Sequence, residues 1–291
     1  MIGRLMRGRQ PIVCLDFGRD QLTAVEVAGG AVTRWTSRPL PEDALRNGDP
    51  VLTGFVANAV RQALDRAGIQ ARRALMALPD EATVSRQVTL PPMPGPELAR
   101  AMRFVAEKHM PFSIDRARWA WDVIKRGREG VTIYLVATWR DVVDRYAEVA
   151  RGAGLEPEVL EPRAVAVGRA LDQEQALVLD ASPRRLYATL LVTGQPTYVD
   201  EVLVGAVLHD EREALHRLLQ RAYRHQSTLG VTPGRLAPVL LAGELEQADL
   251  ELPVAGRPVG DVLNGQLPTA PRGFRPGAYL ANLGLSMRGA R

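Results

Sequence analysis

The strongest constraint on the fold is a strand–Asp–turn–strand unit that occurs twice in the chain. Residues 15–27 align without a gap on residues 179–191, which places Asp16 over Asp180 at an offset of 164 residues. In each copy a short apolar run predicts a buried strand, a polar turn reverses it, and a glycine-containing turn leads to a third strand. Few residues are identical, so a generic hairpin is the alternative, but the shared order favours a duplicated protein with two lobes.

Helical and strand patterns alternate after the first copy. Apolar side chains recur at three- and four-residue steps through residues 50–67 and stop at Gly68, which predicts a helix. Further strands are predicted at 74–78, 131–137 and 156–160, and further helices at 141–153 and 162–171. Alternation of this kind predicts an α/β protein with helices packed on a mixed sheet.

Residues 80–130 do not fit the repeated unit. A strand pattern at 83–90 is broken by prolines, Pro96 opens a helix, and a second strand pattern follows at 117–125. We therefore expect a β-α-β inserted subdomain. Trp119 and Trp121 lie on one side of its second strand, where core packing and the lining of a peptide groove are both open interpretations.

These patterns divide the chain into parts. We expect a first lobe at 11–173, with the insertion inside it, and a second lobe at 174–287, between basic tails at 1–10 and 288–291. The second lobe has one clear helical pattern, from 210 to 228, before its strand at Val239. It is therefore predicted to be reduced.

The charge distribution and the apolar pattern of the chain argue against several classes of protein. The net charge is +4, but the arginines alternate with acidic residues and no RNA-binding or zinc-finger motif occurs, so we expect no nucleic-acid partner. No apolar run is long enough for a membrane span, and no signal-peptide pattern follows Met1, so we expect a cytoplasmic protein. The single cysteine, Cys14, lies in an apolar run and is predicted to be a buried, inert thiol. No catalytic or metal-binding residue is predicted.

A series of ordered motifs resembles one protein family. The motifs are Leu75–Pro79, Arg86–Pro94, Glu97–Ala101, Met110–Phe112 and a variant continuation from Val143 to Pro157. Together they resemble the PilM family of actin-like proteins of type IV pilus assembly, over about residues 11 to 205 and more loosely beyond.

The resemblance implies an actin-like (RNase H-like) fold whose two lobes hold Mg-ATP between them. It also implies that the insertion helps to form a groove for the N-terminal cytoplasmic tail of PilN, a bitopic inner-membrane protein. Such a protein would lie at the inner face of the cytoplasmic membrane, peripheral to it, with a cytoplasmic assembly ATPase as a further candidate partner.

The same resemblance assigns the nucleotide and magnesium contacts to five residues: Asp16, Gly18, Asp180, Ser182 and Gly243. Phosphate-binding loops need small residues and free backbone amides. Here Asp20 stands where a hydroxyl is expected, Ser182 replaces a glycine, Pro183 lacks an amide hydrogen, and Gly243 is single where a pair is expected. These departures predict that ATP hydrolysis is weakened or lost.

The first hypothesis is a non-enzymatic or weakly ATP-binding scaffold of a pilus, competence or type II secretion machine, which binds the tail of a PilN-like protein. The alternative is an active Mg-ATP-binding ATPase of the same fold that switches its affinity for the partner by closing its cleft. A small-molecule kinase is disfavoured, because the second lobe is small and its phosphate loops are altered.

Overall fold

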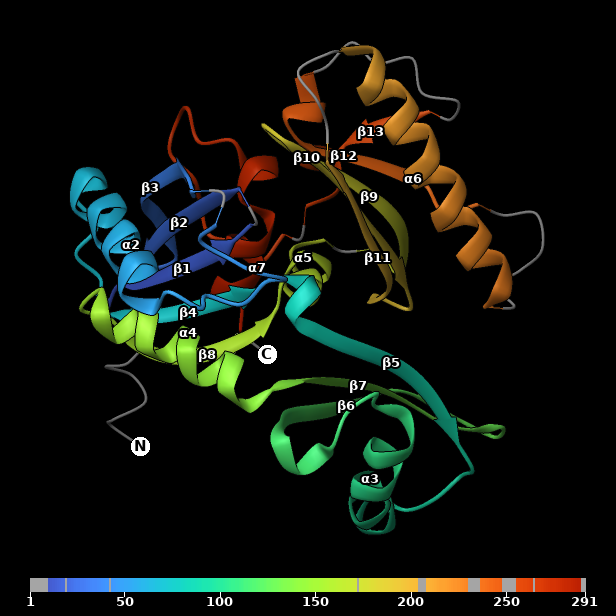
Figure 1. The fold of residues 1–291 in the computed structure, drawn as a ribbon. Helices are drawn as coiled ribbons and strands as arrows, with labels where there is room; N and C mark the ends of the chain where they lie inside the picture. The colour runs from blue at the N-terminus through green and yellow to red at the C-terminus, as the bar shows by residue number, and fades with distance from the viewer. Residues whose placement is uncertain are drawn as a thin grey trace.

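The computed structural model describes residues 10–18, 20–41, 43–171, 173–203, 208–229, 236–247, 255–263 and 265–288. Two five-stranded sheets form the lobes and a three-stranded sheet forms a separate subdomain (Figure 1). Apart from Gln10 and Arg288, the predicted basic tails lie outside the described residues.

The first lobe is built on a sheet of order β3-β2-β1-β4-β8. Its strands are β1 (Ile12–Phe17), β2 (Gln21–Ala28), β3 (Ala31–Pro39), β4 (Arg73–Leu78) and β8 (Glu156–Pro162). β1, β2 and β3 form an antiparallel meander, whereas β4 and β8 run parallel to β1. Helices α2 (Thr53–Ala67) and α4 (Arg140–Gly152) cover one face, where Phe17 and Tyr146 meet edge to face in the core.

The second lobe repeats this plan, with the order β11-β10-β9-β12-β13. Its strands are β9 (Gln175–Ser182), β10 (Arg185–Val192), β11 (Gln195–Leu203), β12 (Val239–Gly243) and β13 (Gly256–Pro258). Asp16 pairs with Thr23 in the first hairpin and Asp180 pairs with Tyr187 in the second, so the registers also match. One long helix, α6 (Leu208–Thr228), packs on this sheet. The predicted duplicated fold with a reduced second lobe is confirmed.

The inserted subdomain comprises β5 (Thr83–Leu90), α3 (Gly95–His109), β6 (Ala117–Gly127) and β7 (Gly130–Trp139), with the sheet order β5-β7-β6. The strand predicted at 131–137 is therefore the centre of the inserted sheet, so the subdomain extends beyond the predicted β-α-β unit. A local apolar pattern predicts a strand but not which sheet it joins. Trp119 and Trp121 pack against the core beneath α3, and Trp121 also lines a cavity between the insertion and the lobes.

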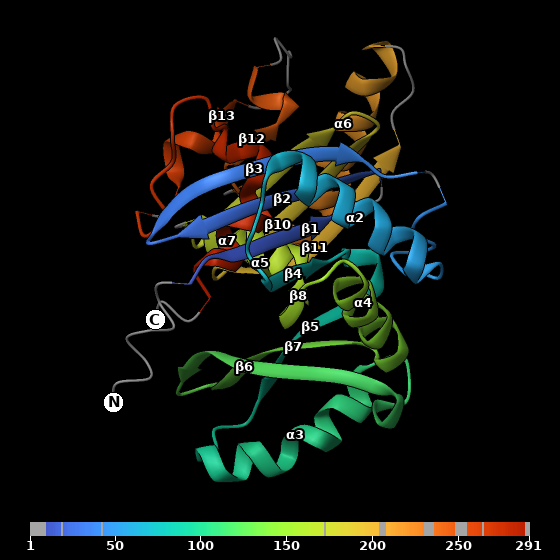
Figure 2. The same cartoon turned by 90° about the vertical axis from the view of Figure 1, so that its left-hand side faces the viewer.

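Two short helices lie between the lobe sheets: α5 (Arg163–Ala170) and α7 (Leu280–Ser286) (Figure 2). A Cβ added to Gly284 would lie 1.8 Å from the carbonyl oxygen of Ala166, so the two helices pack backbone to backbone. Buried Asn282 donates to the carbonyl oxygen of Cys14 at 2.8 Å and so ties α7 to β1. Cys14 is fully buried, as predicted, and burial raises the pKa of its thiol.

Short 3₁₀ turns complete the described chain: η1 (Asp80–Ala82), η2 (Ile114–Arg116), η3 (Glu244–Gln247), η4 (Val259–Val262) and η5 (Pro276–Tyr279).

Candidate functional site

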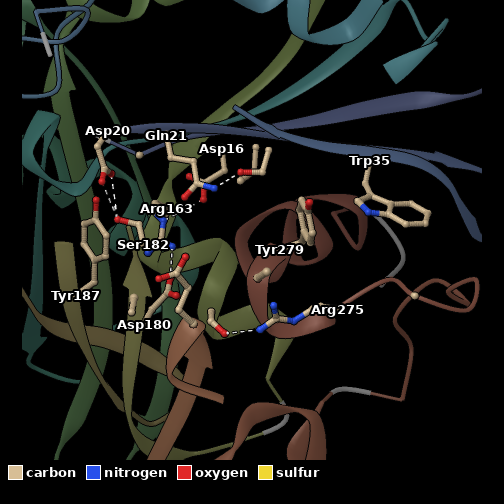
Figure 3. A pocket seen from close by; sticks show the side chains of 18 residues that line it. Asp16, Asp20, Gln21, Trp35, Arg163, Asp180, Ser182, Tyr187, Arg275 and Tyr279 are labelled. Carbon is tan, nitrogen blue, oxygen red and sulfur yellow. Dashed lines mark hydrogen bonds and ion pairs between the residues drawn. The ribbon is translucent and has the colours of Figure 1, made fainter. Parts of the chain in front are cut away.

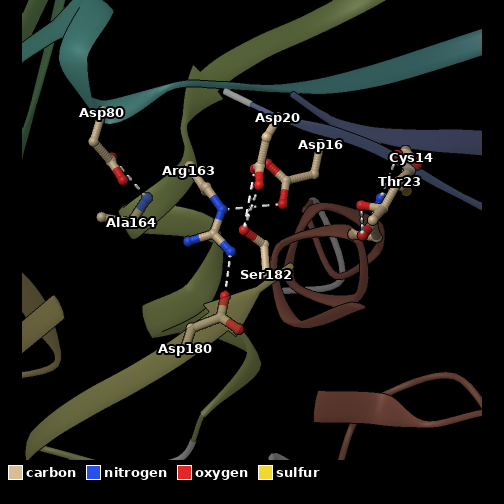
Figure 4. A network of polar contacts seen from close by, with 10 residues as sticks. Cys14, Asp16, Asp20, Thr23, Asp80, Arg163, Ala164, Asp180 and Ser182 are labelled. Carbon is tan, nitrogen blue, oxygen red and sulfur yellow. Dashed lines mark hydrogen bonds and ion pairs between the residues drawn. The ribbon is translucent and has the colours of Figure 1, made fainter. Parts of the chain in front are cut away.

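The two repeated aspartates face each other across the lobes, and an arginine lies between them (Figure 4). Arg163 is the first residue of α5. Its Nε donates to Oδ2 of Asp16 at 3.0 Å, and its Nη2 donates to Oδ2 of Asp180 at 2.5 Å. The three side chains are only 9–15% exposed. We call Asp16, Arg163 and Asp180 the interlobe triad.

Each charged side chain of the triad has a partner of opposite sign. Burial by itself would lower the pKa of Arg163, but the carboxylates of Asp16 and Asp180 raise it well above its ordinary value. Burial raises the pKa of Asp16, and Arg163 opposes that shift. The guanidinium also lies 5.0 Å from the ring centre of Tyr187, within cation–π range. Arg163 therefore stays charged and fixed between the lobes.

A third acidic residue, Asp20, lies in the neighbouring turn. Oδ1 and Oδ2 of Asp20, in the turn after β1, each lie 3.0 Å from the Ser182 hydroxyl, which donates to this carboxylate. The backbone N–H of Arg184 donates to Oδ2 at 3.1 Å. The carboxylate of Asp20, on the first lobe, thus accepts hydrogen bonds from both of these donors in the turn of the second lobe. We call this contact the Asp20 cap.

Asp80, in η1, approaches the same region from a third side. Its Oδ1 accepts the backbone N–H of Ala164 at 3.0 Å, at the start of α5. Burial raises the pKa of Asp80 to about 6, against the opposing effects of Arg163 and this amide. The first turn of α5 is thus surrounded by carboxylates, which offset the unfavourable placement of Arg163 at a helix N-terminus.

A cleft of about 260 Å³ lies beside the triad (Figure 3). All five residues predicted to contact the nucleotide line it: Asp16, Gly18, Asp180, Ser182 and Gly243. Gly243 has a φ of +64°, and a Cβ there would lie 2.3 Å from the Ala181 carbonyl oxygen, so only glycine fits. The structure brings the predicted residues together; their contact with a cofactor remains a prediction.

Arg163, the residue that joins the two halves of this site, is not among the residues predicted from the sequence. A signal was present, since Arg163 follows Pro162 at the predicted start of a helix, where a cation is unfavourable without acidic partners. Those partners are far away in sequence, and only the fold brings them close.

A second, larger cavity of about 790 Å³ lies where the insertion meets both lobes. We call it the three-part groove. Its walls come from β6 and β7, from β8 and α5, and from the turn between β10 and β11. Tyr134 and Val136 line it from the inserted sheet, and Glu161, which is paired with Arg169 and Arg288, lines it from β8.

Two negative findings apply to the described part of the chain. None of its helices has the length and hydropathy required to cross a membrane. No three histidine, cysteine or acidic side chains are grouped there so as to hold a metal ion.

Comparisons with known proteins now identify the family. A model of the family described as "Type IV pilus assembly protein PilM" matches residues 15–211. Among solved structures, the chain is similar to a "PilM-PilN type IV pilus biogenesis complex", with a TM-score of 0.74 and 23% identity over 96% of this chain and 98% of the other. It is also similar to the cytoplasmic domain of EpsL, an inner-membrane component of the type II secretion system of Vibrio cholerae. That match has a TM-score of 0.55 and 12% identity over 86% of this chain and 90% of the other.

No curated protein matches the chain. The structural similarities establish an actin-like fold, and the family model covers more than half of the sequence. This protein therefore belongs to the PilM family of type IV pilus assembly proteins.

Proposed function

We propose that this protein is a non-catalytic actin-like scaffold of a type IV pilus-like machine, with a degenerate nucleotide cleft and a groove for the tail of a membrane partner. The observation that supports a degenerate cleft is Arg163, bound at once to Asp16 and Asp180. Magnesium held by these aspartates would lie against a guanidinium that stays charged. Moving Arg163 away would leave its own buried partners unpaired.

The Asp20 cap gives a second argument for the same proposal. A phosphate would need the hydroxyl of Ser182 and the amide of Arg184, and a carboxylate already accepts from both. Two negative groups cannot share these donors without strong repulsion. Arg163 thus supplies a positive charge where a bound cation would be needed. Asp20 supplies a negative charge where a phosphate would be needed.

Thermal unfolding with and without Mg-ATP tests the degenerate cleft. We expect millimolar Mg-ATP to leave the melting temperature of the protein unchanged, because a ligand raises stability only if it binds the folded state. A clear rise with Mg-ATP, absent with magnesium alone, would refute it.

The three-part groove is the proposed partner site. A structure similar to this chain is a complex of PilM with PilN, and the groove here is about three times as large as the interlobe cleft. We propose that it binds the N-terminal cytoplasmic tail of a PilN-like protein, which would hold the chain at the inner face of the cytoplasmic membrane. A cytoplasmic assembly ATPase is a second proposed partner.

A pair of matched variants tests the groove. Ala120 is exposed and lines the groove, whereas Ala99 is exposed on α3 and does not. We expect Ala120→Trp to fill the groove and reduce binding of a synthetic PilN-type tail at least about tenfold, a loss of about 1.4 kcal/mol. Ala99→Trp is expected to bind like the parent chain. Equal binding by both variants, or none by the parent, would refute the groove assignment.

The alternative function is an active Mg-ATP-binding ATPase that switches partner affinity. The observation in its favour is that a cleft of about 260 Å³ remains beside the triad, with Gly18 and Gly243 in its wall. Under this alternative, Mg-ATP changes the affinity for the tail peptide. Under the scaffold proposal, that affinity is independent of nucleotide.

A further inference from the structure

The positive charge of the chain is concentrated in the inserted subdomain. Residues 83–139 contain nine lysines and arginines against five acidic residues, a net charge of +4. The whole chain has the same net charge of +4, so the remainder is neutral. Both lysines of the protein, Lys108 and Lys125, belong to this subdomain. A charge difference of this kind between parts of one chain indicates a surface that meets an anionic partner.

Helix α3 presents the most distinctive part of this surface. Leu98, Met102 and Val105 are buried against the inserted sheet. On the opposite side Phe104 is 70% exposed, the highest value among the exposed large hydrophobic residues of the described chain. Arg100 and Lys108 stand four residues before and after it, so basic side chains flank an exposed aromatic ring along one stripe of the helix.

The hairpin between β6 and β7 extends the basic surface towards the start of α3. Lys125, Arg126 and Arg128 are exposed at its end. Nη1 of Arg126 donates to the carbonyl oxygen of Met93 at 3.2 Å, just before the helix begins. We call the exposed side of α3 together with this hairpin end the basic face. Figure 2 shows α3 on the side of the inserted sheet that is turned away from both lobes.

The basic face and the three-part groove lie on opposite sides of the same sheet. Ile133 and Leu135 of β7 pack towards α3, whereas Tyr134 and Val136 face the groove. The two surfaces can therefore be occupied at the same time.

We propose that the basic face docks on the anionic surface of a lipid bilayer. Each basic side chain near an anionic bilayer surface adds attraction, and the exposed ring of Phe104 is placed to enter the headgroup region. Phe104 has no other exposed large hydrophobic beside it on α3, whereas a protein interface usually has an apolar core of several such side chains. Single-stranded nucleic acid would require several aromatic rings for base stacking. This proposal rests on the charge distribution and does not depend on tail binding.

Vesicle flotation of the full chain tests the proposal, without any partner protein. We expect the chain to float with vesicles of phosphatidylcholine and phosphatidylglycerol at low salt. We expect it not to float with vesicles of phosphatidylcholine alone. High salt should release it from the anionic vesicles, because screening weakens the attraction between exposed charges. Arg100→Glu with Lys108→Glu should lower the partition coefficient at least about tenfold, and Phe104→Ser should lower it about threefold.

The matched control reverses the charge of two arginines on a helix of the second lobe. Arg217 and Arg224 are exposed on α6, outside the basic face, and Arg217→Glu with Arg224→Glu makes the same change in net charge. If this control floats nearly as well as the parent chain, the proposal is supported, because the change in net charge alone then does not cause the loss of flotation. Equal loss in the control, equal flotation on neutral vesicles, or binding to RNA or an acidic protein without binding to vesicles would overturn it.

Discussion

Nη2 of Arg163, on the first lobe, donates a hydrogen bond to Oδ2 of Asp180 on the second lobe at 2.5 Å. The same guanidinium holds Asp16, so one side chain joins the two copies of the duplicated unit. In the proposed scaffold this contact replaces a bound cation and fixes the angle between the lobes without a ligand. α5, which begins at Arg163, also lines the three-part groove, so the triad and the proposed partner site share this helix.

The first prediction is that Arg163→Ala destabilises the fold strongly. It leaves two buried carboxylates without their partner, and such a change typically costs about 3–5 kcal/mol. Urea unfolding measures the loss. Arg73→Ala is the control, because Arg73 pairs with Glu158 at 2.5 Å but at a more exposed site, where about 0–1 kcal/mol is expected. Similar losses for both variants would show that the triad is an ordinary surface contact.

The second prediction concerns the Asp20 cap. Asp20→Ala frees the hydroxyl of Ser182 and the amide of Arg184, next to cationic side chains. We expect inorganic phosphate to raise the melting temperature of this variant and to leave the parent chain unchanged, because the parent has a carboxylate at these donors. A phosphate response in the parent chain of equal size would mean that the cap does not exclude anions.

The third prediction is a pH dependence that arises from Asp80. Burial raises the pKa of its carboxyl from an ordinary 3.8 to about 6 in the folded chain. The folded state therefore binds more protons than the unfolded state between these values, so this group lowers the free energy of unfolding as pH rises through that window. Asp80→Asn stays neutral and retains an acceptor for Ala164. Its stability relative to the parent should grow from pH 4 to 7, by at most about 3 kcal/mol. Parallel pH curves for the two proteins would contradict this.

The fourth prediction concerns the contact between α5 and α7. Gly284→Ala would place a Cβ 1.8 Å from the Ala166 carbonyl oxygen, so the helices must separate, at a cost of about 3 kcal/mol. Gly54→Ala in α2 is the matched control, since a Cβ there meets no atom within 4 Å and should raise stability by about 0.5 kcal/mol. Calorimetry compares the two variants, and a Gly284→Ala protein as stable as the parent would refute the close packing.

Local sequence patterns were sufficient for the repeated hairpins, whereas the family resemblance supplied Gly18, Ser182 and Gly243 as cleft residues, and Arg163 of the same cleft was not predicted. An apolar run, a polar turn and an aspartate at the strand end specify the hairpin wherever it occurs, and so Asp16 and Asp180 were predicted to be equivalent. The pairing of β7 with β5 and β6 was not predictable in this way. Its apolar pattern suits either neighbouring sheet, and the choice depends on which partner the chain brings near.

The sequence alone determined that the chain is duplicated and that it carries an insertion, because these are properties of residue type and order. Only the tertiary structure decided which charges meet where the two copies of the repeated unit face each other. Asp16, Arg163 and Asp180 are spread over 165 residues, and their charges interact only because the two sheets hold the strand ends at contact distance. Coulomb attraction depends on separation in space and on burial, and neither can be read from positions along the chain.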